Sequence, residues 1–169
     1  RPARRAGNGS ELAGYATGDP RTAAAFVRRF QGRVYGLALT IVRQPAVAEE
    51  VAQETFLRAL RSYGSLKHAS NLRSWVFTIA ARVAVDDYRR RRPEPLDGEP
   101  ATEDSRPAYA ELEHLADGLP PKERVAVVLR YGYDLEYAEI ATALGSSEEA
   151  ARQAASSGVR RLRRKGVQL

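Results

Sequence analysis

The chain has 169 residues, which suits one ordinary domain or two small ones. It contains no Cys and only two distant His, so a disulfide framework and a thiolate metal site are excluded and a zinc site is not expected. The net charge is +6, and all but three of the 27 basic residues are Arg, whose planar guanidinium suits phosphates and guanine edges.

The N-terminal residues 1–9 are basic but lack the apolar segment of a signal peptide. No apolar run approaches the roughly 18 residues that a membrane span requires. We therefore expect a soluble, cytoplasmic protein with no membrane span. A short helix is predicted for residues 10–17.

Three long helices are predicted in the first half of the chain. Asp19-Pro20 provides an N-cap and a first-turn proline, and an apolar stripe at helical spacing follows. Pro45 opens a second helix that reaches about residue 62, and a loop is expected over residues 63–71. A third helix covers residues 72–91, and Pro93 stops it. The side chains predicted to face the core are Phe26, Val27, Phe30, Val34, Leu37, Ala38 and Ile41 in the first helix, Val47, Val51, Thr55, Phe56, Ala59 and Leu60 in the second, and Leu72, Trp75, Val76, Ile79 and Val83 in the third.

The stretch over residues 93–111 holds four Pro and six acidic residues but few large apolar ones. Such a segment cannot bury enough apolar surface to offset the entropy of ordering it. We therefore predict an all-α protein of two small helical domains joined by a flexible linker. The N-terminal domain covers residues 10–92, the acidic, Pro-rich linker 93–110 and the C-terminal domain 111–166.

The second half of the chain is also predicted to be helical. A helix begins near Pro121 and closes near Gly132. Asp134 is predicted to cap a short helix over residues 135–144, which ends at a turn made by Gly145. Ser146, with Glu149 three residues on, has the form of a capping box that opens a last helix to about residue 165.

These last two helices have the spacing of a helix-turn-helix. Ala141 is small where the second helix would cross, and Ala151 would pack back towards the first helix. The outer face of the last helix presents polar and basic side chains that could reach base edges in a major groove, and its basic end suits phosphates. An amphipathic helix with a solvated basic face is the alternative interpretation. The small-residue spacing favours the helix-turn-helix.

The outer face of the helix over residues 45–62 sets one large apolar residue, Leu57, among polar ones. A single exposed Leu is ordinary on a protein surface. The alternative is a protein-binding ridge, in which acids and Gln53 surround an apolar anchor.

Three runs of sequence together resemble the extracytoplasmic-function (ECF) sigma factors of bacteria. AEEVAQETFLRA (48–59) resembles the polymerase-binding helix of that family, and LRSWVFTIAAR (72–82) resembles its next helix, which reads the minus-ten promoter element. LPPKERV (119–125) with YAEIA (137–141) resembles the start of its domain that reads the minus-thirty-five element. The resemblance covers about residues 10–165, with the three runs in the family's order.

The resemblance implies an alternative sigma factor that binds core RNA polymerase and directs promoter recognition and transcription initiation. It implies no enzymatic activity, no cofactor and no metal. The implied partners are promoter DNA and the coiled coil and flap of the large polymerase subunits, and many members of the family are also restrained by an anti-sigma factor.

Roles for individual residues follow from the same resemblance. The implied polymerase contacts are Glu50, Gln53, Glu54, Leu57 and Arg58. The implied minus-ten DNA contacts are Asn71, Arg73, Trp75, Arg82, Asp86, Arg89 and Arg90, although the place of Trp75 on the inner stripe favours core packing. The implied minus-thirty-five contacts are Arg152, Gln153, Ser156 and Arg160, in a helix that departs from the family by having Ala154 where an Arg is common.

Two other classes of function compete with this interpretation. A transcription regulator that works without polymerase would use the helix-turn-helix alone and leave the face around Leu57 idle. An enzyme such as a nuclease or phosphotransferase would need an acidic centre, for which Asp86-Asp87 beside Arg82 and Arg89 is the candidate. We interpret that pair as salt bridging along a helix.

Overall fold

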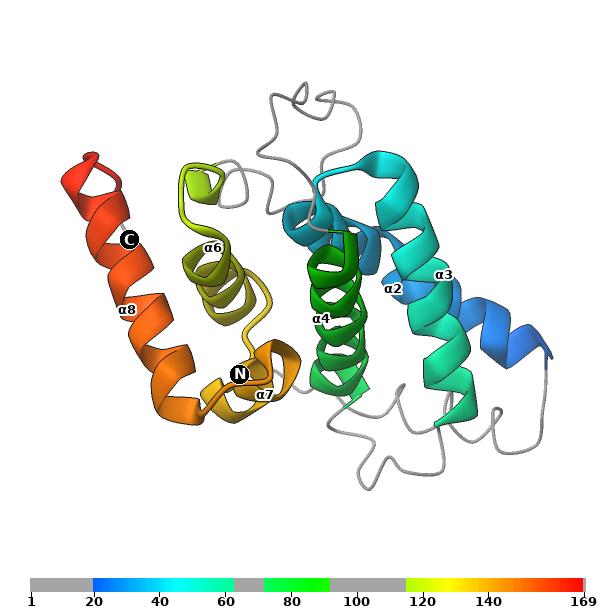
Figure 1. Cartoon of the computed structure of the whole chain (residues 1–169). Coiled ribbons are helices and arrows are strands. Elements are labelled where there is room, and N and C mark those ends of the chain that lie inside the picture. Colours follow the sequence, from blue (N-terminus) through cyan, green and yellow to red (C-terminus); the bar gives the residue numbers. More distant parts are fainter. Residues whose placement is uncertain (1–19, 63–71, 92–114, 169) are drawn as a thin grey trace.

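The structure is a computed structural model that describes residues 20–62, 72–91 and 115–168 (Figure 1). Every element over these ranges is helical, which confirms the all-α class. The elements are α2 (Pro20–Val42), α3 (Pro45–Arg61), α4 (Leu72–Arg91), α6 (Pro121–Val127), the π-helical turn η4 (Val128–Gly132), α7 (Tyr137–Leu144) and α8 (Glu148–Arg164). The predicted helix over 10–17, the cap at Asp19, the loop over 63–71 and the linker over 93–110 lie outside the described residues.

Helices α2, α3 and α4 pack on one another and form what we call the N-terminal unit. The predicted inner faces of α2 and α3 are largely correct, with Phe26, Val34 and Val51 among the side chains that lie almost entirely out of water. The prediction for Leu60 was wrong, because this side chain is 38% exposed. Leu60 follows Leu57 by three residues and therefore shares the outward side of α3.

Helix α4 is buried on more than one side, which its predicted single stripe did not anticipate. Leu72, Val76 and Val83 are buried as predicted, whereas Trp75 and Ile79 are only half-buried against the core. Additional side chains are buried, namely Phe77, Ala80, Ala81, Ala84 and Val85. The reason is that α4 contacts α2 and α3 on one side and α7 on the other, as Figure 1 shows.

In the C-terminal unit, residues 115–168, α6 leads directly into the wider π-helical turn η4. The amide of Tyr133 donates to the carbonyl of Val128, five residues back, which is the spacing of a π-helix. The predicted cap at Asp134 was wrong, because this residue has a positive φ of 58° and ends the preceding turn. Glu136 is the N-cap of α7, and it forms a reciprocal capping box with Glu139.

The turn between α7 and α8 has the form predicted for a helix-turn-helix, with one correction. Gly145 adopts φ 64°, and the amide of Ser146 donates to the carbonyl of Ala141 at 3.0 Å, which closes α7 with a Schellman motif. Ser146 is therefore used to end α7. The N-cap of α8 is Ser147 instead, whose hydroxyl accepts from the amide of Ala150 at 3.0 Å.

Helix α8 packs closely on α6 at Gly158. A Cβ at this position would lie 2.5 Å from a methyl carbon of Val127, which is stiff because it is β-branched. We expect Gly158→Ala to lower the free energy of unfolding by about 1–2 kcal/mol, because overpacking outweighs the gain in helix propensity. The matched control is Gly32→Ala in α2, where an added Cβ would have no atom outside the backbone of its own helix within 4 Å. This substitution should raise the free energy of unfolding by up to about 1 kcal/mol. Thermal unfolding followed by circular dichroism would show the two shifts, and equal signs would contradict the expectation.

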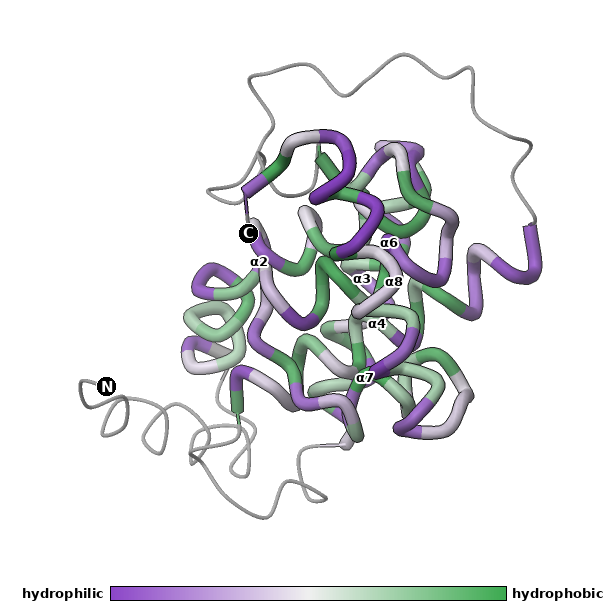
Figure 2. The backbone as a smooth tube through the Cα atoms, turned by 90° about the vertical axis from the view of Figure 1, so that its left-hand side faces the viewer, coloured by the Kyte–Doolittle hydropathy of each residue, from purple (hydrophilic) through white to green (hydrophobic). Residues whose placement is uncertain are grey.

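The two units share one core. The buried apolar side chains of both belong to a single cluster, and Figure 2 shows the hydrophobic stretches of the helices gathered mostly towards the middle of the molecule. The C-terminal unit thus packs directly on the N-terminal unit, with α7 beside α4.

Candidate nucleic-acid and protein interfaces

The outer side of α3 carries the five residues predicted to contact a protein partner, and we call this surface the α3 ridge. Glu50, Gln53, Leu57 and Arg58 are exposed, and Glu54 is half-buried. Leu57 is 48% exposed, which is unusual for a large apolar side chain in this structure. Glu54 forms an ion pair with Arg58 at 3.0 Å, one helical turn further on. The ridge is therefore a polar surface with an accessible apolar centre.

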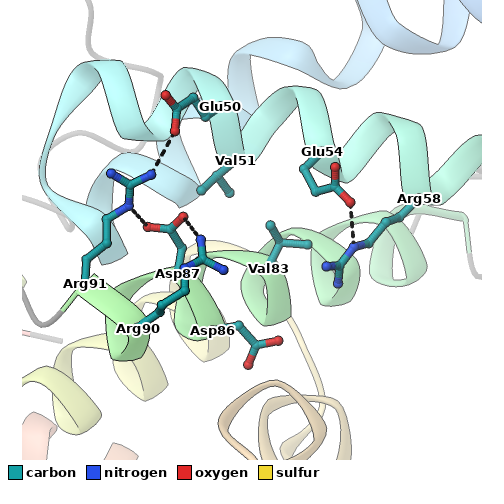
Figure 3. A pocket seen from close by; sticks show the side chains of 9 residues that line it. All are labelled: Glu50, Val51, Glu54, Arg58, Val83, Asp86, Asp87, Arg90 and Arg91. Atoms are coloured by element: carbon teal, nitrogen blue, oxygen red, sulfur yellow. Dashed lines mark hydrogen bonds and ion pairs between the residues drawn. The ribbon is translucent and has the colours of Figure 1, made fainter.

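A polar groove of about 340 Å³ separates the α3 ridge from α4 (Figure 3). Acidic and basic side chains from both helices line it, and Val51 and Val83 form part of its apolar lining. The charged lining residues are Glu50, Glu54, Arg58, Asp86, Asp87, Arg90 and Arg91. The groove therefore joins residues of the predicted protein-binding surface to residues of the predicted DNA-binding helix.

Asp87 organises the charges at one end of this groove. The residue is 7% exposed, and its carboxylate forms ion pairs with Arg90 and Arg91, each at 2.8 Å. Arg91 in turn pairs with Glu50 of the α3 ridge at 3.0 Å, as Figure 3 shows. Asp87 thus fixes two arginines at the C-terminal end of α4, and one of them, Arg91, links α4 to α3.

Neutralising Asp87 should destabilise the fold, because it breaks two ion pairs of a buried carboxylate. We expect Asp87→Asn to lower the free energy of unfolding by about 1–2 kcal/mol in urea titrations. The neighbouring Asp86→Asn is the matched control, because Asp86 is exposed and its substitution should change stability by less than about 0.5 kcal/mol. A similar loss in both variants would show that the effect comes from net charge rather than from the buried ion pairs.

The predicted minus-ten residues lie along α4 with different exposures. Arg82, Asp86, Arg89 and Arg90 are exposed, whereas Arg73 and Trp75 are half-buried. The Arg73 guanidinium lies 5.7 Å from the centre of the Phe77 ring, and Trp75 packs against the core, as its place on the inner stripe indicated. Asn71 lies outside the described residues.

Arg89 already has a partner within the chain. Its guanidinium donates to the carbonyl of Leu144, the last residue of α7, at 2.6 Å. A cation at a helix C-terminus is favourable because it meets unpaired carbonyls and the negative end of the helix dipole. Arg89 is therefore occupied by the helix-turn-helix when the two units are packed together.

The predicted minus-thirty-five residues Arg152, Gln153, Ser156 and Arg160 are all exposed on α8. Arg152 pairs with Glu148 at 3.3 Å and with Glu149 at 3.5 Å, and it lies 4.8 Å from the centre of the Tyr137 ring. Arg160 donates to the hydroxyl of Ser157 at 3.1 Å. The outer face of α8 is thus open to a partner, but two carboxylates hold its first arginine.

Other kinds of site were sought over the described ranges. Residues 20–62, 72–91 and 115–168 contain no group of three His, Asp or Glu that could hold a metal ion. Over the same ranges, no helix combines the length and apolarity needed to cross a membrane.

Comparison with known families identifies both units. The family model described as Sigma-70 region 2 matches residues 26–94, and the one described as Sigma-70, region 4 matches residues 115–164, together more than half of the chain. The chain is 35% identical over 147 residues to the RNA polymerase sigma factor CarQ of Myxococcus xanthus, covering 80% of this chain and 83% of CarQ. The chain belongs to the ECF sigma factors. It is also 34% identical over 148 residues to the ECF RNA polymerase sigma factor SigE of Mycolicibacterium smegmatis. That match covers 77% of this chain and 57% of SigE.

Solved structures with the same fold include two protein complexes, one of which contains a sigma factor. CnrH, in complex with the cytosolic domain of CnrY, gives a TM-score of 0.61 at 21% identity and covers 90% of this sigma factor and 92% of CnrH. RpoE of Bartonella quintana, in complex with the anti-sigma factor NepR, gives a TM-score of 0.63 at 19% identity, and the match covers 83% of this sigma factor and 94% of RpoE. These likenesses extend over both units of the sigma factor.

Sequence reasoning missed several residues that the structure of this sigma factor brings into prominence. Asp87 was named only with Asp86 as a pair that forms salt bridges along the helix, and its ion pairs with Arg90 and Arg91 confirm this interpretation for Asp87. Its burial was not predicted, although Asp87 continues the helical spacing of Val76, Ala80 and Val83. Arg91 was not selected either, because its pairing with Glu50 depends on how α3 and α4 cross. Helical spacing could have indicated Asp87, but no local signal indicates Arg91.

Proposed function

We propose that this ECF sigma factor binds core RNA polymerase through the α3 ridge. The exposed Leu57 carries the proposal, because an accessible apolar side chain surrounded by polar ones is the arrangement of an interface anchor. The run 48–59 that resembles the polymerase-binding helix of the family covers most of this surface. The coiled coil of the large polymerase subunit is the partner that the family implies, with the flap as a second contact for the C-terminal unit.

The same function assigns two DNA surfaces. The α4 residues Arg82, Asp86, Arg89 and Arg90, with Asn71, Arg73 and Trp75, serve separated minus-ten DNA, where splayed bases can stack on aromatic or guanidinium planes. The exposed α8 residues Arg152, Gln153, Ser156 and Arg160 serve the minus-thirty-five duplex through its major groove. In this assignment residues 10–92 and 111–166 are the two working domains, the intervening segment tethers them, and the protein acts in the cytoplasm, where polymerase and chromosome are.

Control by an anti-sigma factor is part of the proposal. RpoE is bound to the anti-sigma factor NepR in its solved structure, and CnrH is bound to the cytosolic domain of CnrY. We expect a stable inhibitor to co-purify with this chain from its native host. Recovery with polymerase alone would count against an inhibitor.

Run-off transcription with purified core polymerase on a genomic promoter library tests the function. The chain should direct specific start sites that core polymerase alone does not produce, and the sequenced products would define its promoter. Binding to duplex DNA without binding to core polymerase would instead indicate a regulator that works without polymerase.

A further inference from the structure

Two arginines share the ring of Tyr137, the first residue of α7. The guanidinium carbon of Arg130 lies 4.7 Å from the ring centre, and that of Arg152 lies 4.8 Å from it. The two arginines come from different elements, Arg130 from η4 and Arg152 from α8. A guanidinium over the face of a tyrosine ring is attracted by the negative charge of that face. The ring therefore joins the π-helical turn to the helix that carries the predicted minus-thirty-five contacts.

The ring of Tyr137 is held in place before any partner arrives. It is partly buried and packs against the hydrophobic core. Arg130 is held as well, because its guanidinium donates to the carbonyl of Leu135 at 3.0 Å and lies 3.8 Å from the carboxylate of Glu136. That carboxylate also offsets part of the repulsion between the two cations that share the ring. The ring therefore offers Arg152 a fixed contact.

Arg152 contacts the ring and two carboxylates at the same time. One of its terminal nitrogens lies 3.3 Å from Glu148, and the other lies 3.5 Å from Glu149. The contact with the Tyr137 ring is made while both terminal nitrogens reach these other partners, so the two kinds of contact are compatible. The planar fork of an arginine can donate in the same way to a phosphate or to a base edge. Because both carboxylates are exposed, DNA can replace them without displacing the guanidinium from the ring.

A fixed ring matters for Arg152 because this side chain is long and exposed. Its side chain is 46% exposed on the outer face of α8. A long exposed side chain loses much of its rotamer freedom when it binds a partner, and that loss weakens binding. A contact that already limits the positions of the guanidinium lowers this cost before DNA arrives. Tyr137 is placed to make Arg152 a preorganised DNA contact.

We propose that Tyr137 is a positioning residue for minus-thirty-five recognition. It holds the guanidinium of Arg152 on its ring while the terminal nitrogens exchange Glu148 and Glu149 for DNA. Arg130 is the second part of this arrangement, because it holds the ring from η4. The proposal rests on the proposed function, since Arg152 needs positioning only if α8 binds DNA.

Binding of the full chain to a labelled minus-thirty-five duplex, taken from a promoter that the run-off experiment defines, is the first test. Tyr137→Leu keeps a large apolar side chain but removes the ring face, and it should weaken binding about threefold. Tyr137→Phe keeps the ring face and should bind as the wild type does. The matched control is Tyr131→Leu, which removes a tyrosine of η4 that is 52% exposed and should also leave binding unchanged.

Two further backgrounds show whether Tyr137 acts through Arg152. In the Arg152→Gln chain, Tyr137→Leu should cause no further loss of affinity, because the side chain that the ring positions is gone. In the chain with Glu148→Gln and Glu149→Gln, the carboxylates no longer help to hold Arg152, and Tyr137→Leu should weaken binding by more, about fivefold. An equal loss with and without Arg152 would show that the ring acts by itself and would overturn the positioning role.

Nuclear magnetic resonance of the free chain detects the ring contact directly. The side-chain protons of Arg152, assigned by their loss in Arg152→Gln, should be shifted upfield by the ring current in the wild type and in Tyr137→Phe. The shift should disappear in Tyr137→Leu, while circular dichroism stays helical in every variant. Unshifted protons in the wild type, or equal affinities of the Leu and Phe variants, would overturn the positioning role. Shifted protons without DNA binding in any variant would overturn the proposed function instead.

Discussion

Leu57→Asp is expected to weaken binding to core polymerase by about 100-fold or more. Leu57 is the exposed apolar centre of the α3 ridge, and hot-spot side chains of this kind contribute about 2 kcal/mol or more to an interface. The substitution removes that contact and forces a carboxylate to lose water against the partner, next to Glu54. Binding to labelled core polymerase in titration, together with loss of run-off product, would measure the effect.

The control for Leu57→Asp must add the same charge elsewhere on the N-terminal unit. Ala24→Asp meets this need, because Ala24 is exposed on α2 and outside the ridge. It should retain nearly full affinity, and both variants should keep the helical circular dichroism of the wild type. A change of less than about threefold in Leu57→Asp would show that the ridge is not the polymerase contact.

Glu148→Gln combined with Glu149→Gln is expected to raise affinity for minus-thirty-five duplex DNA by about tenfold at low salt. The two carboxylates lie in the first turn of α8 and hold Arg152 at 3.3 and 3.5 Å. Removing them lowers repulsion of phosphates and releases Arg152 for the groove. The same change costs roughly 0.3–1 kcal/mol per residue in helix stability, because acids favour a helix N-terminus. Affinity and stability should therefore move in opposite directions.

Salt dependence and a third substitution separate the two causes of that gain. A plot of the logarithm of the binding constant against the logarithm of salt concentration should be steeper by about one for the double variant than for the wild type. The reason is that one more cationic side chain, Arg152, meets a phosphate. Adding Arg152→Gln to the double variant should remove most of the gain and restore the original slope. A gain that survives Arg152→Gln would come from reduced repulsion alone, and a weaker double variant would show that α8 does not approach the duplex.

Several elements of this sigma factor were determined by local sequence. The helix over residues 72–91 was predicted with the bounds that α4 has, because its apolar spacing begins at Leu72 and Pro93 cannot continue it. The turn at Gly145 was predicted because a left-handed residue is needed there and glycine adopts it at no cost. The family was identified from three runs of sequence, and the family models confirm it.

Caps were less predictable, because neighbouring residues compete for the same role. Ser146 and Ser147 are both good N-caps, and the choice between them depends on which amide closes α7. Asp134 was predicted to be the N-cap of the short helix over residues 135–144, but Glu136 is the N-cap of α7. A π-helical turn precedes α7, and the helix starts two residues later than predicted. Such displacements arise from packing of the turn, which periodicity does not report.

The sequence by itself determined which segments form helices, where the helix-turn-helix lies and which face of α3 is exposed. These properties depend on residues within about one helical turn of each other along the chain. Only the tertiary structure decided that Arg91 would join α4 to α3 through Glu50, that α4 would be buried on both sides, and that Arg124 would end inside the core. Each of these depends on residues far apart in the chain, as in the contact of Arg124 with Thr40. From its neighbours in sequence, an arginine such as Arg124 is expected at the surface. Its hydrogen-bond acceptors are backbone carbonyls, and because every residue has one, no sequence pattern marks which carbonyls will be used.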